Sequence, residues 1–220
     1  KDEHCLGLSE FGKDYIENYI KENHLEHLLV SEKTKKEIKG SARESRLVKL
    51  YKNDFKKYQM AMTLIATVRG IPQTYYGSEI GMAGDKGKGD ADIRQDFPGG
   101  WAGDTNNAFS QSGRTEEQNK FFDFTSKLFQ WRKGKSVIHS GKMTHYIPEN
   151  NVYVYFRYND KETVMVVINN AAETKTFKTN RFQENIKNFK SGKDVLTGKA
   201  VDLKNEISLD GKSVLILELN

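Results

Sequence analysis

The sequence predicts an α/β segment followed by an all-β antiparallel sandwich domain. Two observations carry this prediction. Apolar residues recur with a period of about 3.6 in the helical stretches of residues 54–133, and with a period of about 2 in strand-like stretches after Ser136. The 220 residues can form one large domain or two small ones. We expect a helical N-terminal segment over residues 1–53, the α/β segment over 54–135, and the sandwich over 136–220.

Composition restricts the class of protein. The 35 basic and 30 acidic side chains give a net charge of +5, but the two signs are interspersed along the chain. Nucleic-acid binding needs Lys and Arg gathered on one face, so we expect no nucleic-acid partner. No run of about 18 apolar residues is present, so we expect no membrane span. The single cysteine, Cys5, excludes an internal disulfide and a Cys/His zinc framework, and we expect no metal and no cofactor.

The first region is helical in character. Phe11, Tyr15 and Tyr19 recur at four-residue spacing, which is typical of one face of an amphipathic helix. Gly40-Ser41 predicts a break, after which helical spacing resumes. The charged start of the chain has no apolar stretch, so we expect no signal peptide there.

The second region begins with a helix that Asp54 caps and that Gly70 ends. A short strand is expected over Ile71–Tyr76, with Pro72 near its start, where a missing N–H costs little. A Gly-rich stretch from Gly81 to Gly113 follows without periodicity. Loops longer than about 12–15 residues in a compact domain are usually functional or disordered. The Phe, Pro and Trp residues in this stretch favour an ordered, packed loop.

A second helix follows the loop. Thr115 and Gln118 have the spacing of a capping box, in which each side chain accepts from the other residue's backbone N–H. The apolar face of this helix comprises Phe121, Phe124, Leu128 and Trp131, and the helix is expected to end near Gly134.

The third region alternates in the manner of strands. Val152–Tyr158 and Thr163–Asn169 predict a hairpin joined across Asn159-Asp160. Further strands are expected at Lys175–Lys178, Asp194–Leu196, Glu206–Leu209 and Ser213–Leu219. Short strands at this spacing, with no helices expected between them, are typical of an antiparallel sandwich.

Two motifs carry a resemblance to a known family. The run RGIPQTYYGSEIGM, from Arg69 to Met82, and the run IRQDFPGGW, from Ile93 to Trp101, occur in this order before the second helix. They resemble the segment around the eighth barrel strand of the alpha-amylase family, glycoside hydrolase family 13, in its neopullulanase and cyclomaltodextrinase branch. The structural motif residues are Gly70, Pro72, Tyr76, Gly77 and Glu79.

The resemblance implies that residues 54–135 are the end of a (β/α)8 barrel, comprising its last strand, loop and helix. Active sites of such barrels lie in the loops that follow the strands. The candidate substrate-binding residues are Arg94, Asp96, Trp101 and Asp104, since an aromatic ring suits a pyranose face and charged groups suit hydroxyls. Arg94 and Asp96 pairing with each other to hold the loop is the alternative. Glu79 is expected to be a structural carboxylate or helix-start anchor rather than a catalytic group.

No catalytic residues can be assigned. Retaining glycoside hydrolysis needs two carboxyl groups about 5–5.5 Å apart, and in the family these lie on earlier barrel strands. The family's Asn-His-Asp triplet is also missing, since Ser41-Ala42-Arg43 stands where it is expected. About 140 residues remain outside the sandwich, against about 250 for a full barrel.

We therefore expect a C-terminal fragment of an enzyme that acts on alpha-1,4-glucans: maltodextrin, starch, pullulan or cyclodextrin. The fragment is expected to be inactive alone and to bind an alpha-glucan oligosaccharide. A homo-oligomer, the missing barrel portion or residues 1–53 would cover the open edge of the strand Ile71–Tyr76. The alternative function is a non-catalytic carbohydrate-binding or subunit-interaction module.

Overall fold

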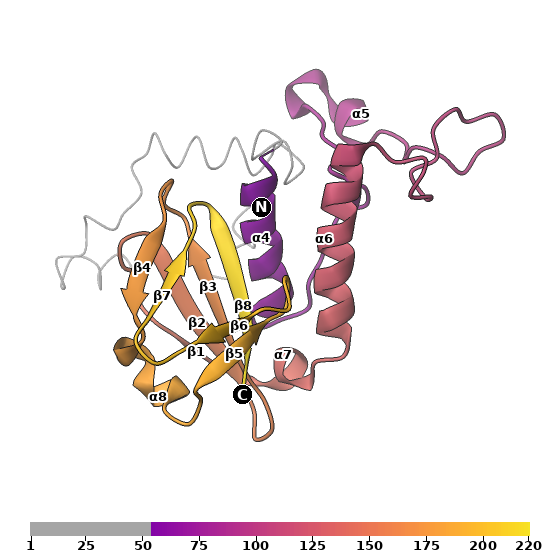
Figure 1. Cartoon of the computed structure of the whole chain (residues 1–220). Helices are drawn as coiled ribbons and strands as arrows, with labels where there is room; N and C mark the ends of the chain where they lie inside the picture. The colour runs from indigo at the N-terminus through magenta and orange to yellow at the C-terminus, as the bar shows by residue number, and fades with distance from the viewer. Residues whose placement is uncertain (1–53) are drawn as a thin grey trace, which may run out of the picture. The chain divides into compact units, whose positions relative to one another are not determined.

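The computed structural model describes residues 54–220, in which a six-stranded sheet has helices on one face and a two-stranded sheet on the other (Figure 1). The strand order of the large sheet is β1-β2-β3-β8-β5-β6, and β4 pairs with β7. Every pairing is antiparallel, as the sequence predicts. The strands are β1 Lys142–His145, β2 Val152–Tyr158, β3 Thr163–Asn169, β4 Lys175–Lys178, β5 Ser191–Asp194, β6 Ala200–Asp202, β7 Glu206–Leu209 and β8 Ser213–Leu219.

Of the six strands predicted for the sandwich, five have the predicted bounds and the sixth is displaced. The strand expected over Asp194–Leu196 ends at Asp194 instead. The Asp194 carboxylate accepts hydrogen bonds from the backbone N–H groups of Leu196 at 3.2 Å and Thr197 at 3.1 Å. These bonds turn the chain, because a short acceptor side chain that binds the following amides favours a turn over a strand.

Alternation along β2 sends its side chains into two separate cores. Val152, Val154 and Phe156 face the two-stranded sheet, whose Ile207 lies in the same cluster. Tyr155 faces the helices and lies in a cluster with Tyr58 and Phe121. The central strands β3 and β8 are covered on both faces, which explains why they are nearly continuous apolar runs.

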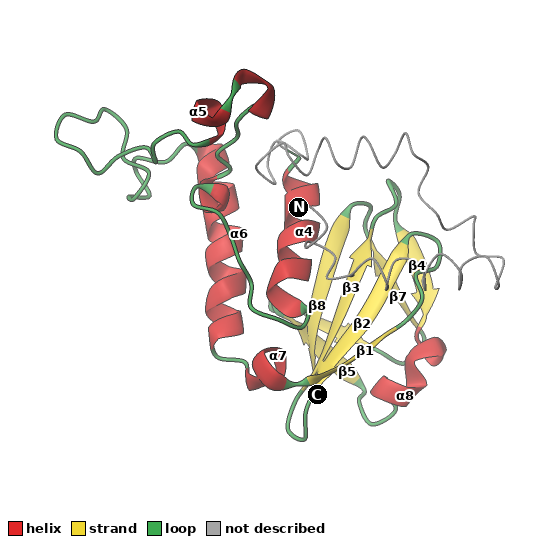
Figure 2. Ribbon diagram, turned by 180° about the vertical axis from the view of Figure 1, so that it is seen from behind, coloured by secondary structure: helices red, strands yellow, loops and turns green. Residues whose placement is uncertain are grey.

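The helices of the first core are α4 (Phe55–Thr67) and α6 (Glu116–Lys133), and α4 lies between α6 and the sheet (Figure 2). Asp54 caps α4 by accepting from the Lys57 N–H at 3.2 Å. The predicted capping box of α6 is confirmed, with Thr115 and Gln118 exchanging hydrogen bonds at 2.9 and 3.1 Å. Between the helices, the buried Tyr58 hydroxyl bonds Thr125 at 2.8 Å, and burial raises the pKa of Tyr58 to about 12.

Two arginines hold the C-terminal end of α4. Arg157 of β2 is 1 % exposed and donates to the Thr67 carbonyl at 2.8 Å and to the Gly141 carbonyl at 3.0 Å. Arg132 of α6 donates to the Ala66 carbonyl at 2.9 Å. The last carbonyls of a helix have no partner within the helix and lie at the negative end of its dipole, so cations stabilise them. The sheet and α6 are thereby both attached to the end of α4.

The helix α4 ends earlier than predicted. Its last residue is Thr67, and the next residue, Val68, is already extended. Gly70, which was expected to end the helix, has φ +119° and bends the chain two residues beyond the observed C-cap residue, Val68. The hydrogen bonds from Arg132 and Arg157 lie at this earlier helix end, and they could not be read from the local sequence pattern.

The strand predicted over Ile71–Tyr76 is not formed. The segment has no strand assignment, and Ile71 is 96 % exposed. A strand needs a neighbour that exchanges backbone hydrogen bonds, and within residues 54–220 no strand pairs with this segment. The expectation of a buried strand at this position is therefore wrong for the chain as described. The predicted helices over residues 1–53, and their covering of this segment, lie outside the described residues.

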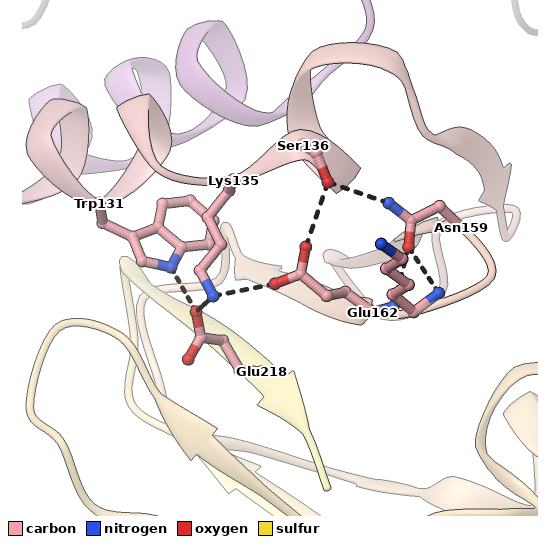
Figure 3. Close-up of polar contacts among 7 residues, drawn as sticks. Trp131, Lys135, Ser136, Asn159, Glu162 and Glu218 are labelled. Carbon is pink, nitrogen blue, oxygen red and sulfur yellow. Dashed lines mark hydrogen bonds and ion pairs between the residues drawn. The ribbon is translucent and has the colours of Figure 1, made fainter.

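The short helix α7 (Ser136–Ser140) and the end of α6 are attached to the sheet by one polar cluster (Figure 3). Lys135 lies 2.7 Å from Glu218 of β8 and 3.0 Å from Glu162, which directly precedes β3. The Trp131 indole N–H also donates to Glu218, at 2.7 Å. The hydrogen bonds that the Lys135 ammonium donates to Glu218 and, to a lesser degree, to Glu162 raise the pKa of Lys135. Burial opposes ionisation of Glu218, but Lys135 and Trp131 more than compensate and lower its pKa.

The helices and the sheet therefore share one core and several polar contacts. The domain boundary between residues 135 and 136 stays a prediction, since the buried residues of α4, α6, β2, β3 and β8 form a single cluster.

The first prediction concerns Arg157. Replacing it in Arg157→Met leaves the Thr67 and Gly141 carbonyls buried without donors, which should lower the free energy of unfolding by about 2–4 kcal/mol. Urea denaturation measures this change. The matched control Lys161→Met, at an exposed hairpin position, should change stability by less than about 0.5 kcal/mol. A loss below about 1 kcal/mol in Arg157→Met would contradict the assigned role.

The second prediction concerns Lys135. The raised pKa of Lys135 stabilises the folded protein at every pH below 10.5, the ordinary pKa of lysine. This stability is lost as the pH rises through the pKa of Lys135 in the folded protein. The lowered pKa of Glu218 stabilises the folded protein at every pH above 4.5, the ordinary pKa of glutamate. This stability is lost as the pH falls through the pKa of Glu218 in the folded protein. Lys135→Met should therefore cost about 1 kcal/mol at neutral pH, and the difference from the parent protein should shrink toward pH 3.

Chemical denaturation at several pH values measures this difference. Lys120→Met is the control, because Lys120 forms only an exposed pair with Glu116 at 3.1 Å, and it should leave the pH profile unchanged. A cost in Lys135→Met that does not vary with pH would exclude the ionic explanation.

Candidate functional site

The candidate substrate-binding residues lie on the long loop before α6. This loop contains the 3-10 helices η3 (Ser78–Ile80) and η4 (Lys86–Lys88) and the short helix α5 (Asp90–Ile93). Figure 2 shows that the part between α5 and α6 projects away from the helices and the sheet. The candidate residues are therefore displayed on the surface rather than enclosed in a cavity.

Trp101 and Asp104 are brought together in one turn. The Asp104 carboxylate accepts from the Trp101 backbone N–H at 2.9 Å, and the Asp104 N–H donates to the Trp101 carbonyl at 3.3 Å. Trp101 is 76 % exposed. Asp104 therefore holds the turn that presents the indole to solvent, and a flat exposed ring of this kind can stack on the apolar face of a sugar.

Arg94 and Asp96 do not pair with each other. Arg94 instead lies 3.5 Å from Asp90 of α5, and both side chains are at least half exposed. Asp96 is exposed and has no hydrogen bond or ion pair with any residue in 54–220. The alternative in which an Arg94–Asp96 pair holds the loop is thus not seen. The roles of all four residues in substrate binding stay predictions.

The structural motif residues occupy the connection between α4 and the loop. Gly77 has φ +80°, a conformation that favours glycine, and its carbonyl accepts from the Met82 N–H at 2.8 Å. Tyr76 donates its hydroxyl proton to the Gln95 carbonyl at 2.9 Å and so links this connection to the loop. Glu79 lies in η3, half-buried beside α6, as expected of a structural carboxylate. Pro72 lies in the irregular segment after Gly70.

Aromatic contacts within the loop agree with the expected ordered packing. The rings of Phe97 and Phe109 lie 4.7 Å apart, and Ala108 donates its N–H to the Pro98 carbonyl at 2.8 Å. Gly99 has φ +102°, and a Cβ there would lie 2.6 Å from Asn107. A side chain at this position would therefore disrupt the approach of the two loop segments.

Arg114 anchors the loop to α6, and sequence reasoning missed it. Its guanidinium donates to the Ala108 carbonyl at 2.9 Å and to the Asn119 side chain at 2.8 Å. It also lies 3.8 Å from the centre of the Phe122 ring, in cation–π geometry. The available signal was a cation directly before the capping-box Thr115 with an aromatic residue eight positions later.

The candidate residues present aromatic, cationic and acidic groups at the surface. No group of three or more His, Cys, Asp or Glu side chains within residues 54–220 could hold a metal ion. Among the helices of this same part of the chain, none is long and apolar enough to cross a membrane. The loop offers an exposed indole, an arginine and two carboxylates, which are groups that bind sugar rings and hydroxyls.

The third prediction concerns the loop anchor. Arg114→Met should loosen residues 95–113 and increase their rate of cleavage in limited proteolysis, because three contacts of the guanidinium are lost. The control is Arg94→Met, which removes only a solvent-exposed pair and should leave the cleavage rate unchanged. Equal cleavage of Arg114→Met and the parent protein would show that other contacts hold the loop.

Comparisons with known proteins agree with this architecture. Residues 143–218, which contain most of the large sheet, match the family model described as the cyclo-malto-dextrinase C-terminal domain. The cyclomaltodextrin glucanotransferase of Bacillus licheniformis is 30 % identical over 57 % of this chain and 15 % of that protein. Neopullulanase 2 of Thermoactinomyces vulgaris is 31 % identical over 54 % of this chain and 18 % of that protein. The matched part of the chain thus spans less than a fifth of each relative.

A solved structure extends the likeness to the helical part. The alpha-amylase of Geobacillus thermoleovorans, in complex with acarbose, matches 80 % of this chain and 37 % of its own, with a TM-score of 0.61 and 23 % identity. At this identity the match shows a shared fold. Together with the family model and the two relatives, it confirms the resemblance inferred from the motifs. Residues 143–218 are therefore similar to the cyclo-malto-dextrinase C-terminal domain, and the chain resembles the C-terminal portion of alpha-amylase-family proteins, glycoside hydrolase family 13, of the cyclomaltodextrinase and neopullulanase type.

Proposed function

We propose that this chain is the C-terminal portion of a glycoside hydrolase that acts on alpha-1,4-glucans such as maltodextrin, starch, pullulan or cyclodextrin. The observation that carries the proposal is the match of residues 143–218 to a cyclo-malto-dextrinase C-terminal domain whose sheet shares a core with α4 and α6. Two relatives have names that refer to cyclodextrin and pullulan chemistry. A domain of this kind, packed on two helices, supports a role beside a catalytic barrel.

Residues 54–135 are proposed to be the end of that barrel. The order helix α4, extended segment 71–76, long loop and helix α6 is the order of a last helix–strand–loop–helix unit. Ile71 is almost fully exposed, although a buried barrel strand would enclose it. Pairing with a neighbouring strand from outside the described residues would supply the missing backbone partners and cover this side chain.

A groove on α6 supports the same proposal. It has a volume of about 360 Å³ and is lined mainly by apolar atoms. Phe122, Phe129 and Glu79 form part of its wall. Exposed apolar grooves of this kind mark contact surfaces, and the rest of the barrel is the occupant we propose. A second copy of the chain is the other occupant that would cover the same surface.

The chain is proposed to be catalytically inactive alone. Arg94, Asp96, Trp101 and Asp104 are proposed to bind glucan, and no catalytic carboxylate pair is assigned among them, because the family resemblance places those groups on earlier barrel strands. A retaining mechanism needs both groups about 5–5.5 Å apart across the scissile bond. Binding without turnover follows from a site that offers one stacking ring and no such pair.

A non-catalytic carbohydrate-binding or subunit-interaction module is the second candidate. The observation that favours it is the 76 % exposure of Trp101, which we propose stacks on a sugar without any further part of the protein. Solution mass separates a carbohydrate-binding module, which should be monomeric, from a barrel end, which should associate through α6 and residues 71–76.

The fourth prediction tests binding and turnover together. The purified chain incubated with maltoheptaose should release no reducing sugar, and calorimetry should detect weak binding. Trp101→Ala should weaken this binding about five- to tenfold, equivalent to about 1 kcal/mol of lost stacking. The control is Ile147→Ala, another highly exposed apolar residue that lies on the sheet domain, and it should bind as the parent does.

Measurable turnover would overturn the proposal that the chain is inactive alone. Equal affinity of Trp101→Ala and the parent would remove Trp101 from the glucan site. If the parent does not bind maltoheptaose at all, the loop of the isolated chain is not a glucan site.

A further inference from the structure

A second site lies on the face of the large sheet that the helices do not cover. It is a groove of about 290 Å³ between β2, β4, the turn after β1 and the 3-10 helix η5 (Thr179–Phe182). Figures 1 and 2 both place β4 on the opposite side of the large sheet from α6. The groove is therefore separate from the loop that carries Trp101.

The floor of the groove is apolar and fixed. Val152 and Val154 of β2 are 7 % and 3 % exposed, and Phe182 is 2 % exposed. Phe177 of β4 is half-buried and lies edge-on to Phe182, with ring centres 5.9 Å apart. These side chains belong to the second core, so a ligand would meet a preformed apolar surface rather than a mobile one.

The rim of the groove carries a net positive charge. Lys175, Lys178 and Arg181 line it together with a single carboxylate, that of Glu149. Arg181 is held in place, since it lies 2.9 Å from Glu149 and donates to the Ile147 carbonyl at 2.8 Å. The groove is therefore lined by three cations and one carboxylate. Because its surface is concave and its walls have a low dielectric constant, the electric field of the cations is concentrated on an anion bound there.

Lys178 is the cation available to a ligand. Lys175 is paired with Glu173 at 2.6 Å, and Arg181 is paired with Glu149. Within residues 54–220, Lys178 has no ion-pair partner, and its side chain is exposed at the groove. Glu206 lies opposite Lys178 in the β4–β7 ladder but forms no ion pair with it, so the ammonium group can pair with an incoming anion without giving up an ion pair to a described residue.

Asn150 and Asn180 add neutral polar groups to the same rim. Asn150 and Asn151 have φ values of 51° and 65°, and they form a tight two-residue turn between Glu149 and Val152. Positive φ at both central residues is typical of a type I′ turn, which asparagine tolerates. The turn therefore presents the Asn150 amide at a fixed place, and Asn180 contributes a second amide from η5. Amides of this kind both donate to and accept from sugar hydroxyls.

We propose that this groove binds a phosphorylated monosaccharide, with the phosphate beside Lys178 and Arg181 and the sugar ring over Phe177. The net charge selects an anion, the two amides match hydroxyl groups, and the volume lies at the small end of ligand sites. A free phosphate shares the anionic chemistry but makes no use of the apolar floor or the amides. This proposal stands independently of the function proposed for the loop.

The fifth prediction tests the groove with the full chain and three probes: glucose 6-phosphate, inorganic phosphate and glucose. Glucose 6-phosphate should bind with a dissociation constant of about 1 mM or lower in low salt. Each of the other two probes should bind at least about fivefold more weakly, because each lacks one of the two groups that the groove recognises. Affinity should fall as salt is added, since the phosphate contact is ionic.

Two matched variants locate the binding. Lys178→Gln should weaken glucose 6-phosphate binding about fivefold or more, because it removes the unpaired cation without touching either core. Lys187→Gln removes an equal charge at an exposed position outside the groove and should bind as the parent does. Thermal denaturation of both variants should be unchanged, which separates lost binding from lost folding.

Three outcomes would overturn the proposal. The first is no binding of glucose 6-phosphate at about 10 mM, which corresponds to less than about 3 kcal/mol of binding free energy. The second is equal affinity for inorganic phosphate, which would assign the groove to the free anion. The third is equal loss of binding in Lys178→Gln and Lys187→Gln, which would show a general charge effect. None of these results bears on maltoheptaose binding by the loop.

Discussion

The arrangement of residues 54–220 depends on which groups donate hydrogen bonds to the backbone carbonyls at the C-terminal end of α4. Arg157 lies within the sheet and is almost completely buried, yet its partners in residues 54–220 are backbone carbonyls rather than carboxylates. Its donors go to carbonyls at the end of α4 and at the start of β1, and burial lowers its pKa. A buried cation is tolerated only where every donor finds an acceptor. The acceptors here are the carbonyls that a helix end leaves unpaired.

This contact explains why helices and sheet behave as one assembly. Arg157 reaches the end of α4 from the sheet, and Arg132 reaches it from α6, so three layers meet at one helix terminus. Just beyond the same C-terminal end of α6, Lys135 joins the helix to β8 and to the residue before β3. An isolated sandwich cut at residue 136 would lose both connections and expose the helix-facing side of β2, β3 and β8.

How much could be predicted from the sequence depends on how local each interaction is. The capping box of α6 and the strands β2, β3 and β8 were predictable, because capping and alternation involve neighbouring residues. The end of α4 was not, because its partners lie 66 and 90 residues away. The short edge strands β1 and β6 were missed, since four and three residues give too little alternation to recognise.

The candidate site shows the same division. Trp101 and Asp104 could be chosen from their motif, and a turn between residues three apart does bring them together. The pairing of Arg94 could not be predicted, because Asp90 and Asp96 are both near in sequence and only the helix α5 places Asp90 beside it. Arg114 was missed because its partners, a loop carbonyl and a helix ring, are neighbours only after folding.

The clearest conflict between sequence and structure is segment 71–76, which was predicted to be a strand and is irregular. The physical cause is that the segment has no neighbouring strand to pair with among the described residues. Its β-branched and aromatic residues favour a strand, but strand formation is a property of a pair, since each backbone group needs a partner on a neighbouring strand. An unpaired segment with strand propensity therefore remains irregular even when its sequence is suited to a sheet. The motif residues around it keep their own local geometry, with Gly77 in a left-handed turn and Tyr76 bound to the loop. The turn and the loop contact thus form without the strand, so the connection to the candidate site is already built before any neighbouring strand is supplied.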